Sequence, residues 1–326
     1  MSGSAPDQDR LAAAAGRHLG RPVRVEDLRR LSGGASRETW SFDAVTDDGG
    51  RDALVLRRDP AGYLGWSERT VEFDLLRRAH DGGVAVPRVR FLLEDSDDLG
   101  SGFVMERVEG ETIARKILRD DDYATARPRL ARQCGEQAAR IHAVDPAVLP
   151  QLPVEQADGQ LARYRQFLDD FGEPHPAFEL GMRWLTDRVP PAREARLVHG
   201  DFRNGNLVVG PDGLRAVLDW ELAHLGDPVE DLGWLCVKSW RFGVSDQRVG
   251  GFGTVDELIA GYRGTGGDDV DPETLAWWEM FGTLKWGVIC QVQAAAHLTG
   301  TVRSVELAAL GRRVAEMEWD VLELLP

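Results

Sequence analysis

The chain has 326 residues, a length that allows two domains or two lobes of one fold. Its net charge of −15 at pH 7 argues against a nucleic-acid-binding protein, in which a basic face is expected. Cys134, Cys236 and Cys290 form no CxxC pair, so they predict buried thiols and neither a disulfide framework nor a metal site. The N-terminal segment MSGSAPDQDR lacks the apolar region of a secretory signal, and no run of about 18 apolar residues occurs. We therefore expect a cytoplasmic protein without a membrane span.

The first third of the chain has the pattern of a small, mostly antiparallel β lobe. A polar tail and a short helix at 11–19 come first, followed by a strand, a glycine turn and a second strand over residues 23–42. Further strands are expected at 53–57, 86–93 and 102–108, with a helix at 67–80 between the first two of these.

The glycine turn of this lobe contains Gly33 and Gly34, followed by Ser36. Glycines let backbone N–H groups approach a phosphate without a Cβ in the way, and a serine adds a hydroxyl donor. An ordinary β-hairpin turn is the alternative interpretation. Alternation along the next strand puts Arg57 on one face, where Glu72 from the following helix can pair with it. The alternative is that both side chains are solvated charges.

After residue 110 the hydrophobic pattern becomes helical. It predicts helices over 112–118, 124–144, 161–171, 178–189, 228–238, 255–263, 272–298 and 302–325. The sequence Asp227-Pro228-Val229-Glu230 is a helix start, with an Asp cap, a Pro in the first turn and a Glu three residues after the cap.

Residues 197–235 bring polar side chains to the ends of short apolar strands. A hairpin over 207–218 places Asp201, Asn206 and Asp219 near one another. Carboxylate and amide oxygens suit a hard cation such as Mg²⁺ and the phosphates that it carries.

These motifs resemble one known family. The combination of His199-Gly200-Asp201 with Asn206, and of Asp219 with Asp227 and Asp231, is similar to the aminoglycoside phosphotransferase/choline kinase-like family over about residues 20–320. Within that family, the chain most resembles the phosphotransferase-like proteins associated with acyl-CoA dehydrogenases. The resemblance implies an α+β, bilobal protein-kinase-like fold with a small antiparallel β N-lobe and a larger, mainly α-helical C-lobe. The implied domains are a tail and short helix at 1–19, a nucleotide-binding N-lobe at 20–108, and a helical C-lobe at 109–326 with its catalytic loop at 197–221 and acceptor-binding helices.

The resemblance also implies a role for each residue of the pattern. Asp201 is the expected catalytic base, which orients a substrate hydroxyl, and Asn206 and Asp219 are the expected Mg²⁺ ligands. His199, Asp227 and Asp231 are expected to be structural. In the N-lobe, the residues implied to bind ATP (with GTP not excluded) are Gly33, Gly34, Ser36, Arg57, Glu72, Met105, Glu106 and Val108.

The segment 105–108 is expected to bind adenine mainly through its backbone. The backbone C=O of Glu106 and N–H of Val108 would bind adenine, with Met105 behind it. Kinases usually place a Lys where this chain has Arg57, and the two cations differ because Arg forks two donors and stays charged. Arg58 is the alternative partner, but strand alternation favours Arg57.

The acceptor site is less specified by the sequence. Arg203, Glu221 and Lys285 are candidate substrate residues, and cations at 203 and 285 would favour an anionic acceptor over a polycationic aminoglycoside. For the helix 272–298, the simpler interpretation is that its Trp residues pack in the core and that Lys285 lies on a solvated face.

The function expected from all of this is an ATP- and Mg²⁺-dependent phosphotransferase acting on a hydroxyl of a small molecule. A hydroxyacyl thioester or another small metabolite is slightly favoured over an aminoglycoside. The alternative is a catalytically weak pseudokinase that regulates a partner. A metallohydrolase is not favoured, because this chain has no His-rich motif that would supply the remaining metal ligands. A protein kinase is not favoured either, because this chain has no recognisable activation segment between Asp219 and Asp227. The sequence does not specify the oligomeric state.

Overall fold

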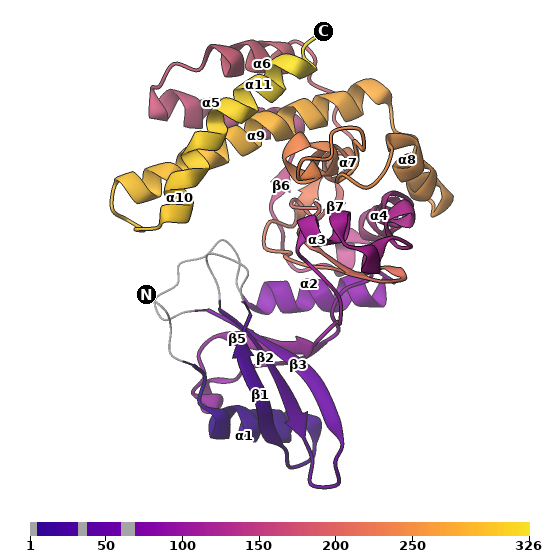
Figure 1. Ribbon diagram of the computed structural model, residues 1–326, viewed down its shortest axis with the longest axis vertical. Helices are drawn as coiled ribbons and strands as arrows, with labels where there is room; N and C mark the ends of the chain where they lie inside the picture. The colour runs from indigo at the N-terminus through magenta and orange to yellow at the C-terminus, as the bar shows by residue number, and fades with distance from the viewer. Residues whose placement is uncertain (1–4, 32–37, 60–68) are drawn as a thin grey trace. The chain divides into compact units, whose positions relative to one another are not determined.

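The computed structural model describes residues 5–31, 38–59 and 69–326. These residues form two compact units (Figure 1). The first unit takes the described residues up to Gly110 together with two later segments, Ala147–Gln151 and Arg215–Leu222. The second unit comprises Glu111–Pro146, Leu152–Leu214 and Ala223–Pro326.

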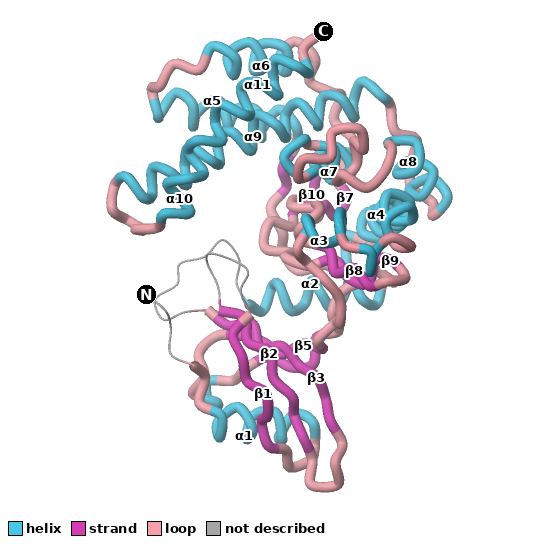
Figure 2. Tube along the Cα trace, in the orientation of Figure 1, coloured by secondary structure: helices cyan, strands magenta, loops and turns pink. Residues whose placement is uncertain are grey.

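The first unit is built on a five-stranded sheet with strand order β1-β2-β3-β5-β4, in which every neighbouring pair is antiparallel. This confirms the small antiparallel β lobe that the sequence predicts. Its helices and strands, coloured by type in Figure 2, are α1 (Gln8–Leu19), β1 (Arg24–Arg30), β2 (Glu38–Val45), β3 (Arg51–Arg58), α2 (Arg69–Asp81), β4 (Val89–Leu92) and β5 (Gly102–Glu106).

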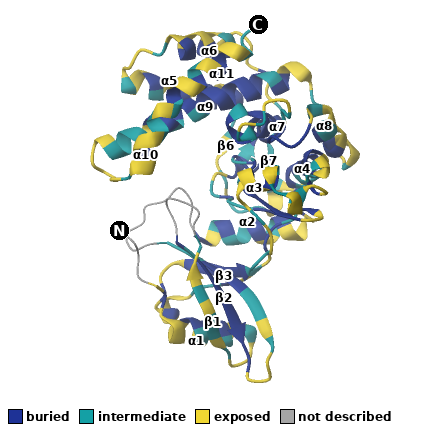
Figure 3. Ribbon diagram, viewed as in Figure 1, coloured by how far each residue is buried: buried dark blue, intermediate teal, exposed yellow. Residues whose placement is uncertain are grey.

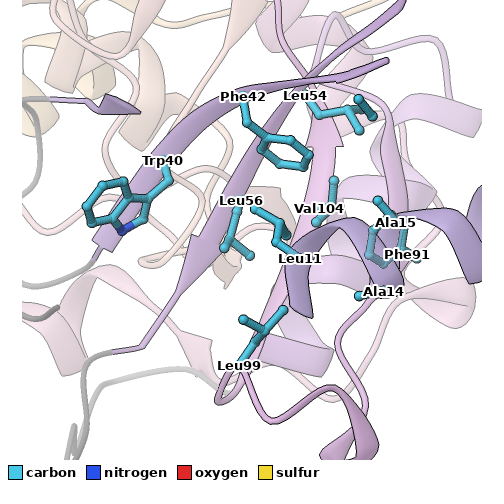
Figure 4. Close-up of a cluster of buried hydrophobic side chains, with 11 residues drawn as sticks. Leu11, Ala14, Ala15, Trp40, Phe42, Leu54, Leu56, Phe91, Leu99 and Val104 are labelled. Carbon is cyan, nitrogen blue, oxygen red and sulfur yellow. The ribbon is translucent and has the colours of Figure 1, made fainter. Parts of the chain in front are cut away.

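Helix α1 covers one face of this sheet. Leu11, Ala14 and Ala15 of α1 pack with Phe42 of β2 and Leu54 of β3 in a buried cluster (Figure 4). Burying a large apolar side chain contributes about 1.5–3 kcal/mol, so the helix predicted at 11–19 is part of the core of this unit. Because side chains alternate along a strand, the neighbouring residues of β2 and β3 point to the opposite face of the sheet.

The second unit is mainly helical. Its helices are α3 (Ala114–Arg119), α4 (Arg127–His142), α5 (Ala157–Phe171), α6 (Pro176–Thr186), α7 (Val229–Cys236), α8 (Val255–Gly264), α9 (Pro272–Leu298), α10 (Val305–Leu310) and α11 (Val314–Leu324). Three short strands form a sheet in the order β6-β10-β7, with bounds Val154–Glu155, His224–Gly226 and Arg196–Val198. The predicted hairpin is formed by β8 (Leu207–Gly210) and β9 (Gly213–Val217).

Helix α9 is the centre of the helical packing, and Figure 3 shows it largely buried. It contacts α5, α6, α7, α10 and α11. Trp277 and Trp278 are each 1% exposed, which confirms that they pack in the core. The side chain of Asp271 accepts a hydrogen bond from Thr274 N at 2.9 Å and Pro272 follows it, so the helix begins where the sequence predicts.

The single helix predicted over 302–325 is wrong. The chain instead forms α10, a 3₁₀ turn at Gly311–Arg313 and α11. A Cβ on Gly311 would lie 2.8 Å from Ala294 Cβ, so glycine permits the close approach to α9 at the point where the helix breaks. The three cysteines are free and buried, as predicted. Among the described residues, no helix is long and apolar enough to cross a membrane.

The crossing of α4 and α8 provides a test of the fold. A Cβ on Gly135 of α4 would collide with the backbone oxygen of Leu258 on α8. We expect Gly135→Ala to lower the free energy of unfolding by about 1–3 kcal/mol, because a packed backbone cannot move aside. Gly159→Ala on the exposed side of α5 is the matched control, because nothing lies near its added Cβ. The free energy of unfolding of the control, measured in urea, should rise by about 0.5–1 kcal/mol. Equal effects of the two substitutions would contradict this packing.

Candidate active site

The loop that follows β7 is held by a buried carboxylate. Strand β7 pairs with β10 and ends at Val198. Asp231 of α7, which is fully buried, then accepts hydrogen bonds from the backbone N–H groups of His199 at 2.9 Å and Gly200 at 3.0 Å. Two backbone N–H groups bound to one carboxylate fix the path of the chain just before Asp201.

Asp231 has a further partner in a buried histidine. His142 Nε2 lies 3.1 Å from Asp231 Oδ2, and His142 Nδ1 lies 2.9 Å from the hydroxyl of Tyr262. Burial raises the pKa of Asp231, but its hydrogen bonds from His142 and the backbone outweigh burial and leave the pKa below its ordinary value. Asp231 therefore stays ionised in the interior, and its contacts are those of the loop anchor that the sequence predicts.

Two further hydrogen bonds hold the same loop. His199 Nδ1 accepts a hydrogen bond from Asp201 N at 3.1 Å, and His199 is fully buried. The side chain of Asn204, also fully buried, donates to the carbonyl oxygen of Gly250 at 2.7 Å. These contacts agree with the structural role expected for His199 and add Asn204 as a second internal anchor.

The carboxylate of Asp201 receives three side-chain hydrogen bonds. Arg203 Nε donates to Oδ1 at 2.9 Å, and Trp234 Nε1 donates to the same oxygen at 2.8 Å. Asn206 Nδ2 donates to Oδ2 at 2.6 Å and to the backbone oxygen of Asp201 at 3.0 Å. The side chain of Asp201 is 15% exposed, so it lies at the edge of the interior with its orientation fixed.

Asp219 belongs to the first unit. It follows β9, whose residue Val217 donates its N–H to Ala85 O at 2.8 Å. The backbone of Asp219 has a left-handed φ of 68°, which costs about 1 kcal/mol or more in a residue other than glycine. Strain of this kind collects at functional sites, where the surrounding structure holds the residue in place.

Arg57 on β3 links Asp219 to α2. Its Nη2 donates to Asp219 Oδ1 at 2.6 Å, and its Nη1 lies 3.1 Å from Glu72 Oε1. The second oxygen of Glu72 binds Arg69, which is also buried. Burial lowers the pKa of Arg57, but the carboxylates of Glu72 and Asp219 more than offset this and raise it. The structure thus pairs Arg57 with Glu72, as strand alternation predicts, whereas Arg58 pairs with Glu38 at 2.7 Å.

The remaining nucleotide residues predicted from the sequence lie around the end of β5. Met105 is buried and pairs with Val55 of β3. Glu106 ends the strand, and its N–H donates to Arg88 O at 2.8 Å. Val108 follows in the segment after the strand, and the binding of adenine by this segment stays a prediction. Gly33, Gly34 and Ser36 lie outside the described residues.

The donor atoms present fit a hard cation. Asn206 of the second unit uses its amide nitrogen to bind Asp201, so its carbonyl oxygen is the atom that would bind a metal. Asp219 of the first unit offers carboxylate oxygens, which such a cation also prefers. Within residues 5–31, 38–59 and 69–326, no group of three or more His, Cys, Asp or Glu side chains forms a metal cluster by itself.

Lys285 of α9 is buried in an ion pair, so the predicted solvated face is wrong. Its Nζ donates to Glu230 Oε1 at 3.1 Å and lies 5.1 Å from the ring centre of Trp234. Glu230 Oε2 also accepts from Gln160 at 2.5 Å and lies 3.2 Å from His224 Nε2. Burial alone would raise the pKa of Glu230, but Lys285 and His224 lower it to about 2.

The helix start at Asp227 also differs from the prediction. Helix α7 begins at Val229, and Asp227 Oδ1 accepts from Val229 N at 3.0 Å while Oδ2 accepts from Trp278 Nε1 at 3.0 Å. Glu230 forms no capping box, because its side chain turns inward to Lys285. Asp227 therefore holds the start of α7 against α9.

The second unit contains an open cavity of about 1130 Å³ between α3, the segment 238–245 and α11. Apolar side chains such as Phe242, Met317 and Trp319 line it together with charged ones. Ser239 and Arg241 of its lining flank Trp240, whose ring lies 4.5 Å from the guanidinium carbon of Arg203. The charged lining residues are Arg115, Lys238, Arg241, Arg313, Glu316 and Asp320.

Sequence reasoning missed the contacts of two residues of α7, Trp234 beside Asp201 and Glu230 beside Lys285. Trp234 and Glu230 lie four residues apart on α7, so they share one side of the helix, but nothing in the sequence indicates that an indole reaches a carboxylate 33 positions earlier. Glu221 lies in the first unit, where it helps raise the pKa of Arg57. Its expected contact with substrate stays a prediction, as do those of Arg203 and Lys285.

The fold and the loop chemistry define a kinase-like phosphotransferase. Residues 27–267 match the phosphotransferase enzyme family, and the chain belongs to that family. A crystal structure of macrolide 2′-phosphotransferase from Brachybacterium faecium aligns with 94% of this chain and 97% of its own at a TM-score of 0.66 and 21% identity. Amicoumacin kinase, in complex with AMP-PNP and Ca²⁺, aligns with 92% of this chain and 89% of its own at a TM-score of 0.59 and 16% identity. These structures confirm the kinase-like fold.

Two relatives in sequence are informative. Acyl-CoA dehydrogenase family member 10 of Mus musculus is 29% identical in an alignment of 290 residues that covers 82% of this chain and 27% of that protein. The chain therefore spans about a quarter of the length of this relative. Hygromycin-B 4-O-kinase of Escherichia coli is 27% identical in an alignment of 224 residues that covers 62% of this chain and 60% of that protein.

The Glu230–Lys285 pair generates a stability prediction. Glu230→Gln leaves Lys285 buried without its counter-charge, so we expect a loss of about 3–5 kcal/mol at pH 7, and the double variant Glu230→Gln/Lys285→Met should recover part of it. The pKa of Glu230 is lowered from 4.5 to about 2 by folding, so its contribution is complete above pH 4.5 and is lost as the pH falls toward 2. Urea unfolding from pH 7 to pH 3 measures the effect. A difference between wild type and Glu230→Gln that stays constant over this range would contradict the assignment.

Proposed function

We propose that this chain is an ATP- and Mg²⁺-dependent kinase that transfers the γ-phosphoryl group to a hydroxyl of a small molecule in the cytoplasm. The observation that carries the proposal is the fixed carboxylate of Asp201 on a loop that also supplies Asn206. Phosphoryl transfer depends mainly on positioning and on neutralisation of charge, and this loop provides an oriented hydrogen-bond acceptor beside a metal-binding oxygen.

The roles of the other residues follow from their contacts. Asp201 would accept the hydrogen bond of the acceptor hydroxyl and orient its oxygen toward phosphorus. Arg57, kept charged by Glu72, would bind phosphate oxygens, for which its forked guanidinium is suited. Asn206 and Asp219 would hold Mg²⁺, which when bound neutralises the phosphate charge. The segment around Glu106 and Val108 would bind the adenine of the nucleotide through its backbone.

A pseudokinase is less well supported. A protein that only binds nucleotide does not need Asp201, Asn206 and Asp219 together. The one departure from the usual kinase pattern, Arg57, keeps an ion pair with the glutamate of α2. The substitution of Arg for Lys therefore gives no reason to expect an inactive site.

The acceptor that we favour is a hydroxylated acyl thioester or another small anionic metabolite. The similarity to the acyl-CoA dehydrogenase relative supports the thioester, and that to hygromycin-B 4-O-kinase supports an aminoglycoside. A kinase assay over hydroxylated thioesters, sugars and aminoglycosides decides between these classes.

Nucleotide binding is tested by thermal unfolding. We expect ATP with Mg²⁺ to raise Tm by more than ATP alone, because a ligand that binds only the folded state stabilises it. In Asp219→Ala the effect of Mg²⁺ should be lost, because a metal ligand is missing. The absence of any shift with ATP, with or without Mg²⁺, would contradict both the kinase and the pseudokinase hypotheses. The same measurement with GTP shows whether the protein prefers adenine or guanine nucleotides.

The role of Asp201 is tested by Asp201→Asn. We expect phosphoryl transfer to fall by a factor of about 10² or more, because the amide is a poor proton acceptor, while the Tm shift with ATP and Mg²⁺ is kept. Asp122→Asn, on an exposed part of the second unit, is the control and should behave as wild type. Turnover by Asp201→Asn at the wild-type rate would show that another group is the base.

A further inference from the structure

The two oxygens of Asp201 differ in the number of hydrogen bonds they accept. Within the described part of the chain, Oδ1 accepts from both Arg203 and Trp234, whereas Oδ2 accepts only the side-chain amide of Asn206. A carboxylate oxygen has two lone pairs directed at donors, so Oδ1 is saturated and Oδ2 has one acceptor position left. The next donor to approach this carboxylate must bind at Oδ2.

Trp234 is itself held in place. It is 4% exposed, the amine of Lys285 lies 5.1 Å from its ring centre, and the ring of Trp240 lies 5.2 Å away. Glu230, one turn earlier on α7, binds the amine of Lys285 and so keeps the cation over the indole. A buried ring with partners on its face and edge cannot turn its N–H away from Asp201 without disrupting the ion pair.

We infer that Trp234 is a positioning residue for the proposed base. Its indole N–H occupies Oδ1, so that Oδ2 of Asp201 is the atom that receives the proton of the acceptor hydroxyl. In that step the O–H bond breaks and the proton passes to Oδ2, the hydroxyl oxygen forms the new bond to the γ-phosphorus, and the bond from phosphorus to the bridging oxygen breaks with its electron pair leaving on ADP. The inference rests on the proposed function, because it takes Asp201 as the base.

The role of Lys285 changes accordingly. The sequence suggests contact with substrate, whereas the structure places its amine behind Trp234, between the indole and Glu230. Lys285 and Glu230 therefore support the orientation of Trp234, and they act on Asp201 only through it. Arg203 alone would leave one lone pair of Oδ1 open, and the carboxylate could then present either oxygen.

The hydrogen bond itself is tested without turnover. In protein labelled with ¹⁵N at the tryptophan indoles, the signal absent from Trp234→Phe identifies the Nε1–H of Trp234. We expect this signal to move upfield in Asp201→Ala, because the charged acceptor is lost, and the signal of Trp277, which donates to Leu185 O, to stay in place. A Trp234 signal that does not respond to Asp201→Ala would overturn the inference.

The positioning role is tested by kinetics with MgATP and the acceptor found in the panel. We expect Trp234→Phe to lower kcat about 10- to 100-fold while both KM values stay within about threefold, because misplacement of a catalytic group affects the transition state more than binding. Trp277→Phe is the matched control, since it also removes a buried indole hydrogen bond, but one made to a backbone oxygen.

The outcomes are distinct. The positioning role would be overturned by a kcat of Trp234→Phe within twofold of wild type. It would also be overturned if Trp234→Phe and Trp277→Phe lost the same fraction of kcat in line with their loss in Tm. Wild-type protein that transfers no phosphate to any acceptor or to water would overturn the proposed function and the role of Trp234 with it. In that case the indole signal still shows whether the hydrogen bond to Asp201 exists.

Discussion

The buried carboxylate of Asp231 is the contact on which the rest of the catalytic loop depends. It binds the backbone N–H groups of His199 and Gly200, so the loop cannot leave the strand β7 at another angle. His142 shares the carboxylate and in turn meets Tyr262 of α8, which connects the loop to the crossing of α4 and α8. A charge in the interior is stable only when it is fully hydrogen-bonded, and here those hydrogen bonds are also the ones that give the loop its shape.

The same principle applies to the other buried charges. Arg57 binds Glu72 and Asp219 in the first unit, and Lys285 binds Glu230 in the second. Replacing such a pair by apolar residues need not destabilise a protein, so stability alone does not explain why the pairs exist. Each of them lies against a group of the proposed site: Arg57 lies against Asp219, a candidate metal ligand, and Lys285 lies against the indole that binds Asp201.

Much of the fold could be predicted because local patterns agree with the tertiary structure. The succession of strands and helix along the small lobe, the hairpin of β8 and β9 and the helix 272–298 all follow from periodicity and turn residues. The predictions failed where packing overrides local preference. A 3₁₀ turn interrupts the predicted helix at Gly311, which lies close to α9, and Glu230 leaves its expected cap because it meets Lys285. Hydrophobic pattern and propensity report on a residue's neighbours in sequence and do not report on its partners in space.

The sequence by itself determined the family and the residue types of the candidate site, because Asp201, Asn206 and Asp219 occur at spacings set by a local hairpin. Strand alternation also favoured Arg57 over Arg58 as the cation of this strand, and the family resemblance supplied Glu72 as its partner. Only the tertiary structure decided that Oδ1 of Asp201 is occupied by an indole and that Lys285 is buried behind it. The physical reason is that these contacts join residues 33 and 55 positions apart on three elements, and only packing of those elements brings them within hydrogen-bond distance.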